Sequence, residues 1–421
     1  MDYITSNSGL QHISEEIFLN LDGPTILICQ EVNHAWNQIL DNSKFWLKMW
    51  AKNGLSKHNR LEWVLLIEAA KDDACIDNEI KIHLKEMYLD VCNVDKSPIF
   101  EAIIWGFSEW IRILAHLLDN PNHPFQNHSN VLTGESFAGW TPIQLAVYPY
   151  CVSHLNIPEI IQILAPLSEK PNAADPEGWT PISRAVKNIQ TLAPNPNAFP
   201  KKHIEENVKI IQILAPLSEN PNIADPEGWT PINQAAKVGN SEIIEILAPL
   251  SENPNAADPE GWKPISWAAK AGNFKIIQIL APLSENPNAP DPKGWTPIHR
   301  GAIIGNKDII ELLAPWSNNP NAPDPRGYTP IARAAFRGDK EIIEILAPLS
   351  HDDVNSPDPK GWPPIARAAF NGNKEIVEIL APLTDNANAP NNFGITPIQL
   401  AARNQITGAE IIKILAPLVN K

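Results

Sequence analysis

The chain has 421 residues, a formal net charge of −15 at pH 7 and an isoelectric point near 5.2. An acidic chain without a run of Lys and Arg lacks the positive surface that neutralises phosphates, so we expect no nucleic-acid partner. A single hydrophobic core rarely serves more than about 300 residues, so the length predicts more than one structural unit.

The cysteines and the N-terminus predict the cellular compartment. The four cysteines are far apart and show no C-x-x-C spacing, which indicates a reducing environment (Cys29, Cys75, Cys92 and Cys151). The N-terminal residues contain neither a basic start nor an apolar run, and no stretch of about 18 uncharged apolar residues occurs in the chain. We therefore expect a cytoplasmic protein without a membrane partner.

Residues 10–50 predict a small helical domain. Apolar side chains recur at helical spacing in three stretches, which begin at Ile13, Ile26 and Phe45. Asp22-Gly23-Pro24 supplies a break between the first two stretches. Three short amphipathic helices fit this pattern.

Within these residues, the order Glu16-Ile17, Leu21, Val32, Trp36 and Phe45-Trp46 resembles the F-box, a short helical motif. Ser14 stands where that family usually has proline, and the first helix is a residue or two short. The resemblance implies docking on the adaptor subunit of a cullin-RING ubiquitin ligase through Ile13, Glu16, Ile17, Leu21, Pro24, Val32, Trp36 and Trp46. The alternative is a helical cap that only protects the end of the following repeats. Residues 51–96 predict a helical linker without candidate functional residues.

Residues 97–421 consist largely of one unit copied in tandem. Its marker glycines are separated by 39, 50, 33, 33, 33, 34 and 33 residues (Gly139, Gly178, Gly228, Gly261, Gly294, Gly327, Gly361 and Gly394). A fixed period in this range predicts a solenoid, in which each repeat packs on its neighbours and a long surface favours binding over catalysis. The longest interval contains an insertion, so we expect a long loop at about 188–205.

The unit that starts at Asp225 shows the local signals. Asp225-Pro226-Glu227-Gly228 predicts a type I turn at the tip of a hairpin. Thr230-Pro231 predicts the cap and first residue of a short helix, which Gly239-Asn240 ends. A second helix is expected from Glu242 to about Leu250, with an apolar stripe. The proline in its last turn should bend or end that helix.

A turn and two antiparallel helices with a T-P-I-x-x-A-A start resemble the ankyrin repeat. The resemblance covers 97–421 as nine repeats, the first of them a degenerate unit near Ser97-Pro98. It implies an all-α fold, an ankyrin-repeat solenoid of helix-turn-helix repeats with β-hairpin loops, preceded by the small F-box-like helical domain.

Two positions of the repeat are candidates for partner binding. The residue after the turn glycine is aromatic in seven repeats, and Arg stands before the small-residue pair of several first helices. The aromatic row is either a ladder in which each ring lies on the next hairpin or an exposed binding stripe. The arginines favour an acidic partner segment, or else pair inside the fold with carboxylates such as Asp324 or Asp358. The candidate partner-binding residues are Trp179, Arg184, Trp229, Trp262, Trp267, Trp295, Arg300, Tyr328, Arg333, Trp362 and Arg367.

The sequence shows no catalytic motif. It contains no G-x-S-x-G, H-E-x-x-H, phosphate-loop or dinucleotide-binding pattern, and its histidines are dispersed, so we expect no cofactor and no metal. These observations predict a non-enzymatic adaptor in which residues 13–50 dock on the ligase and the repeats hold a protein substrate. The alternative is an interaction scaffold without a ligase link.

Overall fold

The computed structural model describes residues 98–418, except for 106–107, 118–120, 126–136, 149–156, 193–200, 351–353 and 385. The F-box-like segment, with the predicted adaptor-binding residues from Ile13 to Trp46, and the predicted linker 51–96 lie outside the described residues. Every regular element in the described residues is a helix, so this part of the chain is all-α as predicted. None of these helices is long and apolar enough to cross a bilayer.

The chain divides into two compact units. Unit 1 comprises the residues up to 188 together with 201–219, and unit 2 comprises 189–200 and 220–421. In unit 1, α8 packs on α9 and α10 on α11, and α11 also contacts α13. The helices that begin in unit 1 are α8 (Pro98–Trp105), α9 (Ser108–Leu117), α10 (Pro142–Val147), α11 (Ile157–Leu164), α12 (Pro181–Leu192) and α13 (Lys201–Leu214).

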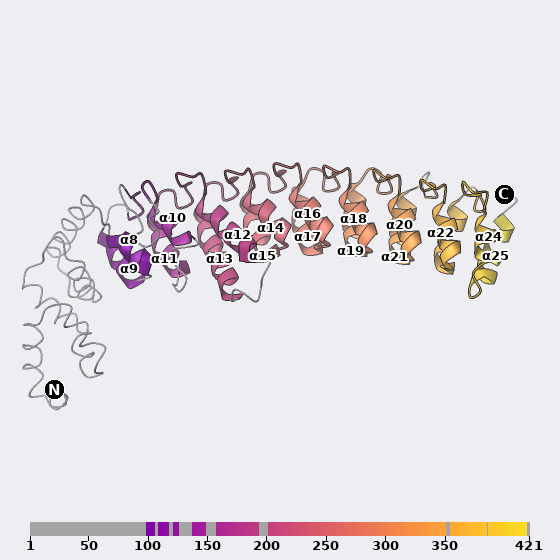
Figure 1. Cartoon of the computed structure of the whole chain (residues 1–421), viewed down its shortest axis with the longest axis horizontal. Helices are drawn as coiled ribbons and strands as arrows, with labels where there is room; N and C mark the ends of the chain where they lie inside the picture. The colour runs from indigo at the N-terminus through magenta and orange to yellow at the C-terminus, as the bar shows by residue number, and fades with distance from the viewer. Residues whose placement is uncertain are drawn as a thin grey trace, which may run out of the picture. The chain divides into compact units, whose positions relative to one another are not determined.

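Unit 2 is a stack of helix pairs (Figure 1). The first helices of its repeats are α14 (Pro231–Val238), α16 (Pro264–Ala271), α18 (Pro297–Ile304), α20 (Pro330–Arg337), α22 (Pro364–Asn371) and α24 (Pro397–Ala401). The second helices are α15 (Ser241–Leu247), α17 (Phe274–Leu280), α19 (Lys307–Leu313), α21 (Lys340–Leu346), α23 (Lys374–Leu380) and α25 (Gly408–Leu415). Each first helix contacts the next first helix and each second helix the next second helix, as a solenoid requires.

The start of each first helix satisfies backbone N–H groups that have no partner within the helix. In α20, Pro330 occupies the first position and has no N–H to satisfy. The N–H of Ile331 donates to Oδ1 of Asn321 (3.0 Å), and the N–H of Ala332 donates to Oγ1 of Thr329 (3.1 Å). The predicted Thr-Pro helix start is therefore confirmed here. The hydrogen bond from Ile to Asn recurs in the pairs Ile182–Asn172, Ile232–Asn222, Ile265–Asn255, Ile298–Asn288, Ile365–Asn355 and Ile398–Asn388.

The first helix of a repeat ends where the sequence predicts, whereas the second helix ends as an α-helix at Leu247 and not at about Leu250. Gly239 follows α14 with φ of +80°, a conformation that glycine adopts without strain, and its N–H donates to the carbonyls at the end of the helix. Helix α15 ends at Leu247, before the proline, and one turn of 3-10 helix follows. These 3-10 turns are η2 (Ala165–Leu167), η3 (Ala215–Leu217), η4 (Ala248–Leu250), η5 (Ala281–Leu283), η6 (Ala314–Trp316), η7 (Ala347–Leu349), η8 (Ala381–Leu383) and η9 (Ala416–Leu418).

The core lies between the two layers of helices. Ile232, Ala235 and Ala236 of α14 and Ile243 and Leu247 of α15 have no exposed surface. Burying an Ile or Leu side chain stabilises the fold by about 1.5 to 3 kcal/mol, and the small alanines let neighbouring first helices approach closely. Near-identical repeats thus form one continuous apolar core in unit 2.

The expected β-hairpin loops are not β-structure, because the described residues contain no strand. The tip of the loop is a tight turn, and in the repeat of Asp225 the N–H of Asp225 donates to the carbonyl of Trp229 (2.9 Å) and the N–H of Gly228 donates to the carbonyl of Asp225 (2.8 Å). Thr230 is already the cap of the next helix. The helix therefore begins too soon after the turn to leave residues that could pair as a β-strand.

The insertion is not one long loop. Helix α12 has 12 residues and α13 has 14, against 8 in α14 and 7 in α15. The segments 188–192 and 201–205, which the sequence assigned to a loop, are therefore helical. Because Ile189 is a buried apolar residue in the lengthened part of α12, extending this helix adds core surface as well as backbone hydrogen bonds.

Candidate functional site

A buried aspartate organises each turn. In the repeat of Asp324, the carboxylate oxygen Oδ1 accepts the N–H groups of Arg326 (2.8 Å) and Tyr328 (2.9 Å). The same two hydrogen bonds form in the other turns that carry aspartate (Asp175, Asp225, Asp258, Asp291 and Asp358), and each of these residues is only 5% exposed. A carboxylate removed from water requires several donors, and the turn supplies two of them.

The second carboxylate oxygen accepts a hydrogen bond from the side chain nine residues later, in the first helix. Its donors are Arg184 Nε (2.6 Å), Gln234 Nε2 (2.5 Å), Trp267 Nε1 (2.9 Å), Arg300 Nη2 (2.7 Å), Arg333 Nη2 (2.9 Å) and Arg367 Nε (3.0 Å). Three residue types with different size and charge thus share one role. In the turns of Gly139 and Gly394 the aspartate is replaced by Ser136 and Asn391, and the position nine residues later is Leu145 or Leu400. A hydrogen-bond donor therefore stands nine residues after the turn position wherever that position is an aspartate.

The arginines also lie on aromatic rings. The Cζ atom of Arg333 is 4.0 Å from the ring centre of Tyr328 in its own turn and 5.9 Å from that of Trp295 in the preceding turn. Arg300 lies between Trp295 (5.2 Å) and Trp262 (5.8 Å) in the same way. Trp267, which replaces arginine in one repeat, stacks directly on Trp262 with ring centres 4.5 Å apart. We call this alternating row of rings and donors the ladder.

The ladder shows where the predicted partner-binding residues lie. Trp262 is buried, and the other aromatic members are half-buried (Trp179, Trp229, Trp295, Tyr328 and Trp362). The guanidinium groups of Arg184, Arg300, Arg333 and Arg367 form ion pairs with turn aspartates, which matches the structural alternative for these arginines. Within unit 2, the ladder brings the predicted residues together, and in unit 1 Arg184 lies 5.6 Å from the ring centre of Trp179. The charge of each arginine is balanced by an aspartate of its own repeat.

Two exposed positions that the sequence analysis did not single out lie beside the ladder. One is the turn residue two after the aspartate, which is Glu177, Glu227, Glu260, Lys293, Arg326 or Lys360. The other lies in the first helix of the unit 2 repeats, twelve residues after the aspartate, and is the exposed Lys237, Lys270, Phe336 or Phe370, or the half-buried Ile303. The sequence contains a signal for these positions, because they vary between repeats that are otherwise nearly identical. Such variation indicates that the residue at that position is not required for folding.

These exposed residues contact the ladder. Lys237 Nζ lies 4.1 Å from the ring centre of Trp229, and Phe370 packs edge-on against Trp362 at 5.8 Å. The guanidinium of Arg326 lies 5.7 Å from the ring centre of Trp295. The turn residues and the first-helix residues of unit 2 therefore border one surface, which we call the turn face.

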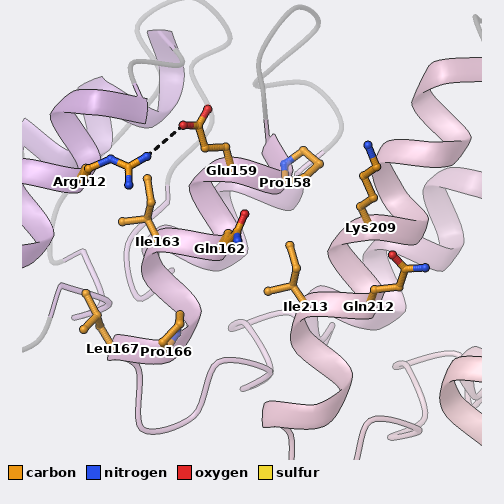
Figure 2. A pocket seen from close by; sticks show the side chains of 10 residues that line it. All are labelled: Arg112, Pro158, Glu159, Gln162, Ile163, Pro166, Leu167, Lys209, Gln212 and Ile213. Atoms are coloured by element: carbon orange, nitrogen blue, oxygen red, sulfur yellow. Dashed lines mark hydrogen bonds and ion pairs between the residues drawn. The ribbon is translucent and has the colours of Figure 1, made fainter.

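Unit 1 contains a separate hollow of about 910 Å³ between α11 and α13 (Figure 2). Ile163, Leu167 and Ile213 supply apolar lining, and Lys209 lies at its border. Arg112 and Glu159 form an ion pair at 3.2 Å across one end. The lining offers no nucleophile with a base and no paired carboxylates. No cluster of His, Cys, Asp and Glu suited to a metal ion occurs in the described residues.

One histidine is built into a helix start. His299 Nδ1 accepts the N–H of Thr296 (3.0 Å), and its Nε2 donates to the carbonyl oxygen of Ala322 in the next turn (2.6 Å). Burial lowers the pKa of His299, while the Ala322 hydrogen bond and the nearby Asp324 and Asp291 act in the opposite direction. The geometry suits the neutral ring, because a proton on Nδ1 would face the N–H of Thr296.

Comparison with known families identifies the repeats. A family model described as Ankyrin repeats (3 copies) matches residues 202–291, 283–358 and 333–420, which together cover more than half of the chain. No F-box model matches the N-terminal residues. No curated protein matches the chain.

The natural replacement of aspartate and arginine in the last repeat generates a stability prediction. Arg367→Leu alone should lower the free energy of unfolding by on the order of 3 kcal/mol, because it leaves the buried Asp358 carboxylate without its charged partner. Asp358→Asn combined with Arg367→Leu should recover most of that loss, since Asn391 and Leu400 show that this pair suits the repeat. Urea unfolding of both single variants and the double variant measures the coupling. A double variant no more stable than Arg367→Leu would contradict this account of the aspartate.

Acidification should destabilise unit 2 through His299. The folded state has the lowered pKa, so the unfolded chain takes up the proton at the higher pH. The stabilisation is complete above about pH 6.5, the ordinary histidine value, and is lost as the pH falls below it. We expect the urea midpoint of the wild type to fall more than that of His299→Gln between about pH 7 and pH 5.

Glutamine is the matched control because Gln144 makes the equivalent contacts in unit 1. Its Oε1 accepts the N–H of Thr141 (2.7 Å) and its Nε2 donates to the carbonyl of Ala173 (2.9 Å). Identical pH profiles for the wild type and His299→Gln would show that this histidine does not couple protonation to folding.

Proposed function

Because this chain belongs to the ankyrin-repeat family, we propose that it is a non-catalytic protein-binding scaffold whose turn face holds a partner protein. Ankyrin repeats serve in general as protein-interaction modules. The described residues offer a rigid, repeated frame and no constellation of catalytic groups.

The observation that carries the proposal is the separation between constant and variable positions in unit 2. The turn aspartate, its donor and the aromatic ring hold each repeat in the same geometry. The exposed positions beside them change from Lys237 and Lys270 to Phe336 and Phe370. A frame that holds its contact residues in place loses less conformational entropy on binding, and exposed aromatic side chains supply much of the energy of protein interfaces.

The predicted partner-binding residues of the ladder contribute to the proposed binding surface. The half-buried rings of Trp229, Trp295, Tyr328 and Trp362 offer accessible surface beside the exposed positions. Their geometry is maintained by the arginines beneath or beside them, so Arg300, Arg333 and Arg367 act mainly by positioning these rings. Trp179 and Arg184 form the corresponding pair in unit 1, with the guanidinium 5.6 Å from the ring centre.

We also propose, from the sequence resemblance alone, that residues 13–50 link this scaffold to a cullin-RING ubiquitin ligase. The resemblance rests on Glu16-Ile17, Leu21, Val32, Trp36 and Phe45-Trp46. A protein with both sites would raise the local concentration of its partner at the ligase. A scaffold without this link is the alternative, favoured by the lack of an F-box family match.

The turn face is tested by changing its exposed aromatic residues. Phe336→Lys with Phe370→Lys should lower the recovery of partner proteins in quantitative affinity purification by roughly tenfold or more, because exposed aromatic side chains dominate interfaces. The fold should persist, since Lys237 and Lys270 occupy the same position of other repeats. The control is Leu349→Lys with Leu383→Lys, two residues on η7 and η8 that are each 47% exposed. Partner loss in the control alone would place the binding surface elsewhere.

The ligase link is tested by deleting residues 13–50. We expect binding of the purified ligase adaptor subunit to be lost while the partner proteins held by the repeats are still recovered, because repeat stability depends on neighbouring repeats. Adaptor binding by the deleted chain would exclude the F-box assignment. If the intact chain fails to bind the adaptor and still binds partners, the scaffold without a ligase link is correct.

A further inference from the structure

The charge of the exposed turn residue changes sign along unit 2. The turn residue two after the aspartate is acidic in two repeats, Glu227 and Glu260, and basic in the next three, Lys293, Arg326 and Lys360. All of these side chains are exposed. Three basic side chains in consecutive repeats are an exception in a chain with a net charge of −15.

The first-helix position changes at the same place. Lys237 and Lys270 accompany the acidic turns, whereas Ile303, Phe336 and Phe370 accompany the basic ones. Phe336 is 60% exposed and Phe370 is 49% exposed. Such large apolar side chains usually lie inside a protein, and their exposure beside the half-buried ladder rings makes them available to a partner. The repeats from Asp291 to Phe370 therefore combine basic turns with apolar helix positions.

Contacts with ladder residues link Arg326, Phe336 and Phe370. Arg326 lies over the ring of Trp295, and the guanidinium of Arg367 lies 5.7 Å from the ring centre of Phe336. Phe370 packs against Trp362 of its own repeat. The ladder thus joins the three repeats beneath their exposed side chains.

The turn cations differ from the ladder arginines in their partners. Arg300, Arg333 and Arg367 are neutralised by buried aspartates. No ion pair to Lys293, Arg326 or Lys360 is present in the part of the chain that the structure describes. Their charges are therefore available to a ligand, whereas those of the ladder arginines serve the fold.

We propose that the surface formed by Lys293, Arg326, Lys360, Phe336 and Phe370 binds a segment of a partner protein that combines acidic residues with bulky apolar side chains. Carboxylates would face the turn cations, and apolar side chains would lie on the phenylalanines and ladder rings. A nucleic acid would satisfy the cations alone, leave the phenylalanines uncovered, and be repelled by the net charge of the chain. The inference rests on the proposed scaffold function and specifies the chemistry of its partner.

The test is selection of peptides from a randomised phage-displayed library on the full chain. We expect the selected peptides to be enriched in Asp and Glu together with Leu, Phe or Trp, and to bind less tightly as salt rises. In fluorescence anisotropy with the most enriched peptide, the variant Lys293→Glu, Arg326→Glu, Lys360→Glu should bind at least about tenfold more weakly, since it replaces three attractions by repulsions.

The chain offers a matched control for this charge reversal. The variant Glu227→Lys, Glu260→Lys changes the same turn position in the preceding repeats and should bind the peptide as tightly as the wild type or more tightly. Thermal melting of each variant establishes that the fold persists. Selected peptides without an acidic excess, or equal binding by the charge-reversed variant, would overturn the inference. The two proposals can fail separately. If Phe336→Lys with Phe370→Lys loses protein partners while the charge-reversed variant binds them normally, the scaffold function is retained and only the acidic character of the partner is refuted.

Discussion

The structure of the repeats depends on one buried carboxylate in each turn. Asp324 is 5% exposed, and its two oxygens accept two backbone N–H groups and one side-chain donor. Leaving a buried charge without such donors costs several kcal/mol, so the aspartate constrains the turn and the first helix together. It holds the turn closed, orients the donor side chain, and through that side chain places the aromatic rings of two successive repeats.

This constraint explains which residues vary and which do not. Arg333, Gln234 and Trp267 differ in size and charge but each donates to the turn carboxylate nine residues before it. Where the carboxylate becomes the amide of Asn391, the donor becomes Leu400, because a neutral side chain imposes a smaller penalty on burial. The pairing therefore follows the requirements of charge burial. It leaves the neighbouring exposed positions free to differ between repeats.

The freedom of those exposed positions is the physical basis for the proposed function. The turn residues carry opposite charge in different parts of unit 2, and the first-helix residues change from lysine to phenylalanine. Neither change disturbs the Ile and Ala core or the asparagine hydrogen bonds at the helix starts. A scaffold of this kind separates stability from recognition, so partner chemistry can be changed without loss of the fold.

The sequence by itself determined the features that depend on neighbouring residues. The period, the turn at Asp225-Pro226-Glu227-Gly228, the Thr230 cap and the Gly239 end were all predicted, because caps and breaks act within a few residues. The second helix was expected to reach about Leu250, but its α-helical part ends at Leu247 and Pro249 lies in the 3-10 turn that follows. Tertiary structure decided the rest. Helical residues replaced the expected loop at 188–192 and at 201–205, and Arg333 was placed between two rings and an aspartate, because its burial depends on the preceding repeat. The sequence offered two interpretations of the aromatic row, and only the packing of successive repeats showed that rings and donors alternate.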